Sequence, residues 1–399
     1  MEEWFSDAQG PVVLMLHGRS VPSRPAFAYG GFPTVTGGGL TIPNPLWHYN
    51  WAGQLAEQGI RVFMMDLPGM GLSSRHPRVF DEPRNAYKRD QKRLAPFPLA
   101  TPDAGPYPSP FWSHDQNSDM LDVEQVIHFI TGITGATKVH LIGYSAASFV
   151  LGPFAMQHPD LVHSLFLLAP IFPPFGYSDP PPFMTDPQSA PEKLQCPMFI
   201  QDWDTDLGDP SATQSFLGSW NSEQLMGAER EGFIAADLWA NILSEDATGQ
   251  SWGRGVNRIR NPLWWGWSKQ NVVQDKVVLG KQVPVCIVYG LCDLQVFAKI
   301  RGVRELPGPG QQDLSPSAGP PFSPKWLFDE IQGKQKLMIA IPKTGHFMPW
   351  ETSHGLLHKF SADWITRHKV WPPRPALEPR TPVSTGSYEL SSLNTFISV

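Results

Sequence analysis

The chain has 399 residues, of which 41% are hydrophobic and 17% charged, so it is long and apolar enough to bury one large core or two modest ones. This composition excludes a disordered or fibrous protein. A formal charge of −6 provides no basic field to hold a polyanion, so we expect no nucleic-acid partner. The 42 prolines and 35 glycines are more than usual and indicate long, ordered loops.

The cysteines and the first residues bear on the compartment. Cys196, Cys286 and Cys292 form no CxxC pair and are odd in number, which argues against a disulfide framework or a zinc cluster. The opening MEEWFSDAQG lacks the basic and apolar regions of a signal peptide, and no stretch approaches the roughly 18 uninterrupted apolar residues of a membrane span. We expect a soluble cytoplasmic protein with no membrane partner.

Apolar, β-branched runs alternate with segments of helical spacing along most of the chain, which predicts a mostly parallel sheet buried on both faces. The expected strands are Val12–Leu16, Arg61–Met65, 138–142, 165–168, 283–289 and Lys336–Ile341. The expected helices are 47–58 ending at Gly59, one from Ser118 ending at Gly132 or Gly135, Ser148–Gln157, 325–332 and 355–368. We expect loops at 19–45, which is glycine-rich, and at 73–111, which shows no clear period.

Two segments depart from this alternation. Residues 171–275 contain proline-rich stretches, a helix-like piece at 222–243 and a tryptophan-dense stretch at 252–267 without strand alternation. We interpret 171–275 as a helical cap inserted into a core formed by 1–170 and 276–370. The tail, 371–399, is rich in proline and serine, and its one strand-like piece lies at 393–399.

The strand at 138–142 leads directly into Gly143-Tyr144-Ser145-Ala146-Ala147 and then into a helix. A serine on such a sharp strand-to-helix turn projects its hydroxyl out of the sheet, while the helix N-terminus directs backbone N–H groups toward an anion. Ser145 is therefore the candidate nucleophile, and it needs a base.

Candidate partners follow two later strands. His346 comes after the strand Lys336–Ile341, and Asp293 comes after the strand at 283–289. An imidazole accepts the serine proton when a carboxylate holds its other nitrogen, so this trio can form a Ser-His-Asp catalytic triad. The order Ser, Asp, His is the one expected for a parallel sheet of this kind.

The chain resembles the α/β-hydrolase-fold family over residues 12–368. Val12–Leu16 followed by His17-Gly18 resembles the family's oxyanion strand, and Asp66-Leu-Pro-Gly69-Met-Gly71 resembles its Asp-x-x-Gly-x-Gly turn. The sequences around the three triad candidates match as well. The resemblance implies that the backbone N–H groups of Arg19 and Ala146 form the oxyanion hole, and that Asp66 orders its turn.

The sequence departs from the family pattern in two places. Ala147 replaces the second glycine of G-x-S-x-G, so its methyl group must fit where the helix passes the neighbouring strand. The family also has two strands before the oxyanion strand, whereas about ten residues here supply one at most. The gene start is then truncated, or the tail near Phe396 covers the open sheet edge, or two copies pair edge to edge as a homodimer.

Neighbours of the triad are the expected substrate contacts, namely Gly18, Tyr144 and Phe347, together with Trp264 and Trp265 from the cap. The tryptophans of the stretch at 252–267, Trp252 and Trp267 included, are expected to pack between cap and core, with some of their rings facing the substrate. His48 and His114 are plausible substrate contacts if they lie near the site. The acidic run Asp202, Asp204 and Asp206 lacks the glycine and distal glutamate of a calcium loop, so we interpret it as a solvated loop.

The function that fits these residues is a serine hydrolase. The expected substrate is an ester, lactone or thioester of a bulky apolar or aromatic small molecule, cleaved through an acyl-enzyme without metal or cofactor. One alternative is a non-hydrolytic reaction with the same base and oxyanion hole, such as C–C cleavage, cyclisation or isomerisation of a natural-product intermediate. Another is a receptor that kept the pocket but not turnover.

Overall fold

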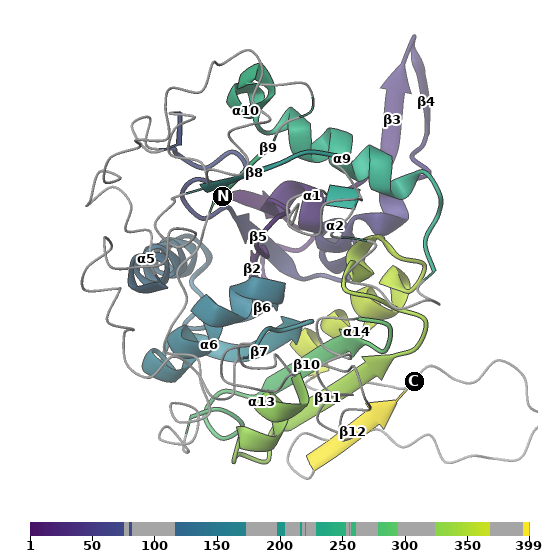
Figure 1. Ribbon diagram of the computed structural model, residues 1–399. Coiled ribbons are helices and arrows are strands. Elements are labelled where there is room, and N and C mark those ends of the chain that lie inside the picture. The colour runs from purple at the N-terminus through teal and green to yellow at the C-terminus, as the bar shows by residue number, and fades with distance from the viewer. Residues whose placement is uncertain are drawn as a thin grey trace, which may run out of the picture.

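The computed structural model describes residues 1–75, 80–81, 116–172, 198–203, 216–217, 220, 229–252, 255, 257–260, 278–293, 324–367 and 394–398. An eight-stranded sheet forms its centre, in the order β1-β5-β2-β6-β7-β10-β11-β12. Every neighbouring pair is parallel except β1 with β5. The mostly parallel sheet predicted from the sequence is thereby confirmed, and Figure 1 shows it at the centre of the molecule.

The strands are short and, in the interior of the sheet, buried on both faces. Their bounds are β1 Glu2–Trp4, β2 Val12–Leu16, β5 Arg61–Met65, β6 Val139–Tyr144, β7 Val162–Leu168, β10 Val285–Gly290, β11 Lys336–Ile341 and β12 Asn394–Ser398. In β2, Leu14 and Leu16 pack into the core on one face, and Val13 and Met15 into the core on the other. This two-sided burial explains why the strands read as continuous apolar runs.

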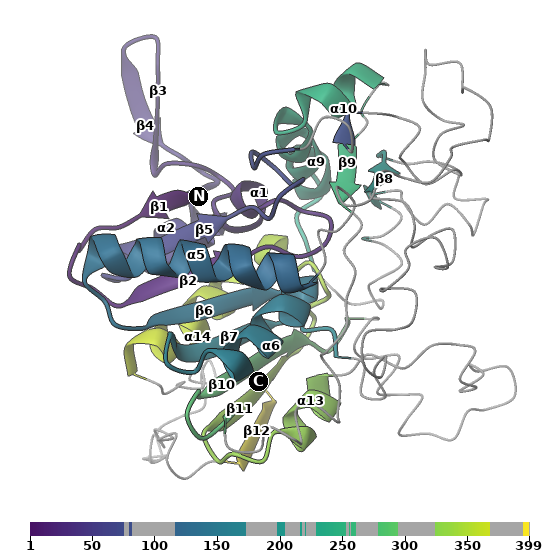
Figure 2. The same ribbon diagram turned by 90° about the vertical axis from the view of Figure 1, so that its left-hand side faces the viewer.

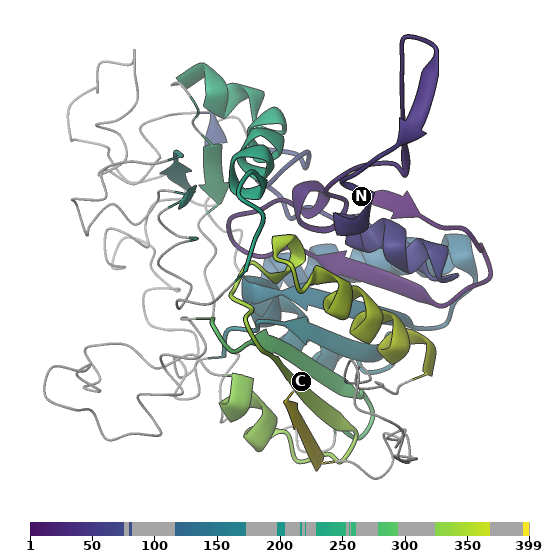
Figure 3. The same ribbon diagram turned by 90° about the vertical axis from the view of Figure 1, so that its right-hand side faces the viewer.

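Helices cover both faces of the sheet. Their bounds are α1 Ser23–Phe27, α2 Trp51–Glu57, α5 Gln116–Thr134, α6 Ser148–Gln157, α13 Pro324–Glu330 and α14 His354–Arg367. Apolar side chains of α5, α6 and α13 form one core with the sheet, whereas those of α1, α2 and α14 form the other. Figure 2 shows α5 and α6 in front of the sheet, and Figure 3 shows α14 in front of the opposite face.

Local sequence signals fix several helix ends. The Asn50 side chain accepts the Gly53 N–H at 2.7 Å and caps the start of α2. Gly59 lies just beyond the end of α2 with a φ of +79°, as the sequence predicts. Gly135, and not Gly132, ends α5, with a φ of +74° that favours glycine.

The two ends of the chain occupy opposite edges of the sheet. β1 pairs antiparallel with β5, so the first residues supply one strand, as expected. β12 pairs in parallel with β11 at the other edge. The strand near Phe396 is therefore present, but the idea that it covers the N-terminal edge is wrong, because β12 lies at the far side of the sheet.

The predicted loop at 19–45 contains regular structure that its glycines obscured. It holds α1 and a hairpin of β3, Thr34–Gly37, with β4, Leu40–Pro43, which projects from the body in Figures 2 and 3. Gly38 and Gly39 form the turn with φ values of +57° and +83°. Two residues with positive φ match the twist of a tight hairpin, which is why glycines occur there.

The region expected to form a cap mixes helices with a small sheet. Its described elements are α9 Ile234–Ser244, α10 Ala247–Trp252, and β8 Met198–Gln201 paired antiparallel with β9 Asn257–Arg260. The prediction of no strand at 252–267 is wrong for β9, because four residues are too few for an alternation to stand out. The helix expected at 222–243 begins only at Ile234 within the described part. The boundaries 171–275 stay a prediction.

Among the described helices, none combines the length and the apolar character needed to cross a membrane.

The parallel strands place their carboxyl ends along one edge of the sheet, and in open sheets of this kind ligands bind at that edge.

Candidate active site

Ser145 occupies a strained turn between β6 and α6. It begins a short 3-10 helix, Ser145–Ala147, and its φ is +53°, which is rare for a residue other than glycine. A Cβ on Gly18 would lie 3.2 Å from Ser145 Cβ and 3.2 Å from the Tyr144 carbonyl oxygen, so the loop after β2 approaches the turn closely. Strain of this kind is typical of functional sites, where the surrounding structure holds it in place.

The methyl group of Ala147 fits the close approach of helix and sheet. Ala147 is 2% exposed. A Cβ on Gly143 would lie 3.3 Å from Ala147 Cβ and 3.0 Å from Leu151 Cδ1, so the space that one glycine leaves is taken up by its neighbours. The departure from the family pattern at Ala147 is therefore accommodated by the glycine at 143.

Ser145, His346 and Asp293 come together, although more than fifty residues separate each from the next. His346 Nε2 lies 2.9 Å from Ser145 Oγ, and His346 Nδ1 lies 2.8 Å from Asp293 Oδ2. All three side chains are buried, and Asp293 is 0% exposed. In such a chain the carboxylate fixes the imidazole with its proton on Nδ1, so that Nε2 can accept the serine proton.

The loops that carry Asp293 and His346 are joined through their backbones. The Cys292 N–H donates to the Thr344 carbonyl oxygen at 2.7 Å. A Cβ on Gly290 would lie 2.1 Å from that same oxygen, so the approach requires glycine. The glycine of Gly290-Leu-Cys-Asp293 thus brings the carboxylate within reach of the imidazole.

Glu351 is a buried carboxyl beside this trio that the sequence analysis did not identify. It is 0% exposed, and its Oε2 accepts the Gly345 N–H at 2.6 Å, one residue before His346. Burial and the negative charge of Asp293 raise the pKa of Glu351 to about 7, although the Gly345 N–H and the nearby His346 oppose the shift. A glutamate five residues after a candidate catalytic histidine was the available sequence signal.

Tyr144 and Phe347, two expected substrate contacts, are buried next to His346. The Tyr144 hydroxyl donates to the His346 carbonyl oxygen at 2.9 Å, so it holds the loop that carries the imidazole. Phe347 stacks on Trp220 with ring centroids 4.6 Å apart. Together with Phe216, Trp239 and Trp350, these two rings form what we call the aromatic cluster.

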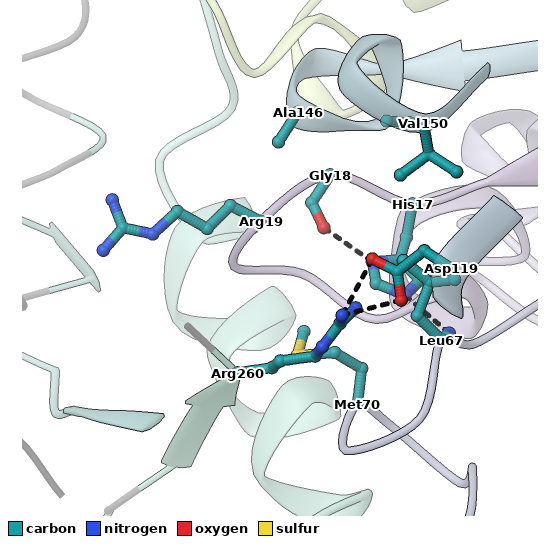
Figure 4. A pocket seen from close by; sticks show the side chains of 10 residues that line it. His17, Gly18, Arg19, Leu67, Met70, Asp119, Ala146, Val150 and Arg260 are labelled. Carbon is teal, nitrogen blue, oxygen red and sulfur yellow. Dashed lines mark hydrogen bonds and ion pairs between the residues drawn. The ribbon is translucent and has the colours of Figure 1, made fainter. Parts of the chain in front are cut away.

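A small cavity of about 20 Å³ adjoins the expected oxyanion hole, and Arg19, Gly18 and Ala146 all line it. Figure 4 shows Ala146 and Val150 along the upper edge of this cavity and Met70 along the lower edge. The Arg19 side chain points away from the cavity centre in this view, and its Cζ lies 4.9 Å from the centre of the Phe199 ring. Arg19 therefore lines the cavity with its backbone and not with its guanidinium group.

His17 ties the loop before Arg19 to the turn after β5. Its Nδ1 donates to the Gly18 carbonyl oxygen at 2.6 Å, and its Nε2 accepts the Leu67 N–H at 3.1 Å. Burial lowers the pKa of His17, which favours this neutral form. Asp66 accepts the Ser23 N–H at 2.7 Å and the Leu72 N–H at 3.1 Å, which is the turn-ordering role expected for it.

A buried ion pair closes the same cavity, and sequence reasoning missed it. Arg260 Nη2 lies 2.6 Å and 2.7 Å from the two carboxylate oxygens of Asp119, and both side chains are almost fully buried. Asp119 belongs to α5 and Arg260 to β9, so the pair joins the helix to the small sheet. Figure 4 shows both side chains beside Gly18 and His17.

The remaining sequence candidates lie elsewhere or outside the described residues. Trp264, Trp265, Trp267, His114, Asp204 and Asp206 fall outside them. The His48 ring lies 5.0 Å from the His354 ring, and the Trp252 ring lies 5.1 Å from the Arg258 guanidinium. Within the described part of the chain, no group of three or more His, Cys, Asp and Glu side chains is arranged to hold a metal ion.

Comparison with solved structures finds proteins of low sequence identity to this chain. A thioesterase domain from the curacin biosynthetic pathway is 16% identical, with 91% of this chain and 93% of that chain covered and a TM-score of 0.44. A monoacylglycerol lipase from Paleococcus ferrophilus is 13% identical, with 92% and 98% covered and a TM-score of 0.43. A thermophilic esterase from Thermogutta terrifontis is 14% identical, with 91% of each chain covered and a TM-score of 0.43.

No curated protein sequence matches the chain. The model of the α/β hydrolase fold family, however, matches residues 11–216, which span the oxyanion strand, the turn at Asp66 and the turn at Ser145. Because this match covers more than half of the chain, the protein belongs to the α/β-hydrolase-fold family.

Proposed function

We propose that the protein is a serine hydrolase that cleaves an ester, lactone or thioester through an acyl-enzyme. The observation that carries this proposal is the continuous chain of hydrogen bonds from Ser145 through His346 to Asp293, at 2.9 Å and 2.8 Å. Ser145 attacks the carbonyl carbon, and His346 accepts the serine proton and then donates it to the leaving group. Water, deprotonated by His346, then releases the acyl group from Ser145.

The oxyanion formed in each step would be held by the backbone N–H groups of Arg19 and Ala146. Two observations support this assignment, since both residues line one small cavity and Gly18 passes within contact distance of Ser145. N–H donors fixed before the reaction stabilise the developing charge without further reorganisation. The chain supplies nucleophile, base and oxyanion donors, so the proposed reaction needs no metal or cofactor.

We propose a bulky apolar or aromatic small molecule as the substrate. The aromatic cluster supports this class, because Phe347 follows His346 directly and its ring lies 6.0 Å from the imidazole. Apolar walls with few polar groups are typical of small-molecule sites. Tyr144 and Phe347 would then act mainly by positioning His346 and the substrate-facing wall, and Trp264 and Trp265 remain proposed cap contacts.

The test is labelling with a fluorophosphonate, followed by mass mapping of the labelled peptide. We expect the label on Ser145 and on no serine of a Ser145→Ala variant. His346→Ala should slow labelling and ester hydrolysis by about 10²–10⁴-fold, the usual contribution of a general base. Ser251→Ala, a change at an exposed serine, is the matched control and should label like the unaltered protein.

A panel of aryl esters, alkyl esters and lactones, hydrolysed in oxygen-isotope-labelled water, tests the reaction itself. We expect one labelled oxygen in the released acid and faster turnover of the aryl compounds. An unlabelled Ser145 in a folded protein would overturn the proposal. Turnover without incorporation of water would instead indicate the non-hydrolytic reaction.

A further inference from the structure

A second cavity, of about 470 Å³, lies between α1 and α9, and none of the three triad candidates lines it. Its walls come from α1, from the loop at 29–31, from Asn44 and Leu46, and from one side of α9, from Asp237 in its first turn to Glu245 just beyond its end. The volume is in the range of small-molecule sites. Figure 2 shows α9 above α1, outside the central sheet.

Two carboxyl groups line this cavity from the α9 side. Asp237 Oδ2 accepts the Tyr29 hydroxyl at 2.5 Å and the Asn241 side-chain N–H at 3.2 Å, so its orientation is fixed. Glu245 follows the last residue of α9, where the helix carbonyls concentrate negative partial charge. Both features favour positive charge in the cavity.

The Glu245 carboxyl lacks a partner on its inner side. Its Oε2 is buried and has no hydrogen-bond partner among the described residues. Burial, followed by the negative charges of Asp66 and Glu2, raises the pKa of Glu245 to about 8, against the opposing influence of Arg24 and Arg75. A buried acceptor without a donor is costly, and a ligand that supplies the donor removes that cost.

The cationic side chain that lines the cavity does not supply this donor. Arg24 is 55% exposed, and its Nε lies 3.7 Å from Glu2 Oε2. The other lining groups are amides, a hydroxyl, the Tyr29 ring and apolar side chains, Pro25, Ala28 and Leu46 among them. The cavity thus combines an apolar wall with two acceptors and a surplus of acid groups.

We propose that this cavity binds a small molecule that carries a protonated primary amine on an apolar body, with the amine at the Glu245 carboxyl. An ammonium group brings three N–H donors and a positive charge, which meets the unpartnered oxygen of Glu245. Asp237, in the first turn of the same helix, adds a second negative charge to the cavity wall. The amine ligand is distinct from the proposed ester substrate, and its binding needs no turnover.

Binding of the amine should release a proton near neutral pH. Because the pKa of Glu245 is about 8, the free protein holds this carboxyl protonated at neutral pH. A bound ammonium group favours the ionised carboxylate. The proton released at about pH 7 should therefore disappear at about pH 9, where Glu245 is already ionised. A cavity that simply collects apolar molecules would release none.

The experiment is isothermal titration calorimetry of the full chain with phenethylamine, in two buffers of different ionisation enthalpy. Phenethyl alcohol and hydrocinnamate are matched probes without the positive charge. We expect millimolar or tighter binding of the amine, at least tenfold weaker binding of the other two probes, and release of close to one proton at about pH 7. Equal binding of all three probes, or no binding of the amine, would overturn the proposal.

Variants assign the two carboxyl groups. Glu245→Gln mimics the protonated form that the free protein already holds, so the fold should persist, which circular dichroism checks. We expect this variant to bind phenethylamine at least tenfold more weakly and without proton release. Asp237→Asn, which removes the more distant charge, should weaken binding less and keep the proton release. Glu124→Gln, on α5 outside the cavity, should change neither quantity. Unchanged affinity and proton release in Glu245→Gln would contradict the proposal.

Discussion

At the scale of single residues, Glu351 is a buried carboxyl whose ionisation changes the charge beside Asp293 and His346. Its carboxyl is buried near Asp293 and His346, and it accepts the Gly345 N–H at 2.6 Å. The groups that act on it also include Arg230 and Cys292, whose own pKa values respond to its charge. When Glu351 is ionised, it places a second negative charge near Asp293 and His346.

We expect Glu351 to make the protein less stable as the pH rises. Its pKa lies at about 7 in the folded chain against 4.5 ordinarily, so its contribution is full below about pH 4.5 and is lost through about pH 7. The loss is on the order of 3 kcal/mol in the free energy of unfolding. Urea unfolding at about pH 5 and about pH 8 measures it, and Glu351→Gln, which keeps an acceptor for Gly345, should flatten this change. An equal pH dependence in both proteins would contradict the expectation.

Gly143 offers a second residue-scale test, because it shares its space with Ala147. Gly143→Ala should lower the free energy of unfolding by about 1–3 kcal/mol, since its Cβ would lie 3.0 Å from Leu151 Cδ1 and 3.3 Å from Ala147 Cβ. Removing the second contact with Ala147→Gly should recover part of that loss. The double-mutant cycle measures the coupling, and strictly additive effects would show that the two positions do not share one space.

The sequence predicted the three triad candidates because each follows a strand within a short motif. It did not predict Glu351 as part of the site, because its link to Gly345 depends on how the loop after β11 turns back. It also missed the pair of Asp119 and Arg260, which are 141 positions apart in the chain. Motifs record local geometry, whereas contacts of this kind arise only when distant elements pack together.

At the scale of elements, the pair of Asp119 and Arg260 joins α5 to β9. A neighbouring pair joins β9 to the start of α10. Arg258 Nη2 lies 2.5 Å from Oδ1 of Asp246, the residue just before that helix. Both arginines are 3% exposed. Alternate positions of one short strand thus carry two buried cations, and each meets a carboxylate.

Asp119→Ala should destabilise the protein by about 3–5 kcal/mol, because it leaves the Arg260 guanidinium buried without its carboxylate. The double change Asp119→Leu with Arg260→Met should cost less than Asp119→Ala alone, since it removes both charges. Thermal and urea unfolding measure both variants, with Asp329→Ala, which breaks an exposed pair with Lys325, as control. A double change that costs more than the single one would show that the pair itself stabilises the fold.

The sequence predicted the long strands that are buried on both faces of the sheet. It did not predict the short strands outside the central sheet. The interior strands and most helices lie within a few residues of their predicted bounds, since long apolar runs leave few alternatives. The hairpin of β3 and β4 was missed because its two central glycines look like part of a loop. β9 was missed because it is only four residues long and because two of its residues are arginines buried in ion pairs, which no hydrophobic pattern reveals.

At the scale of the whole molecule, β12 covers one edge of the central sheet. Its parallel pairing with β11 satisfies backbone groups that would otherwise face solvent. Because β1 covers the opposite edge, the possible homodimer through an open N-terminal edge would have to use β1 itself. The tail thus supplies an edge strand from residues that are far from the rest of the core in sequence.

We expect deletion of residues 394–398 to promote self-association, because it exposes the backbone of β11. Size-exclusion chromatography with light scattering, at several protein concentrations, measures this directly. Phe396→Pro removes one backbone N–H from β12 and should produce a smaller shift in the same direction. Identical elution of the full and shortened chains at every concentration would show that β12 does not protect this edge.

The left-handed backbone of Ser145 has a consequence for the history of such a chain. A φ of +53° at a residue with a side chain costs on the order of 1 kcal/mol, which glycine would avoid. A lineage released from selection for turnover would therefore gain stability by losing its serine. If Ser145 is the proposed nucleophile, the strain at this turn is stability given up for turnover.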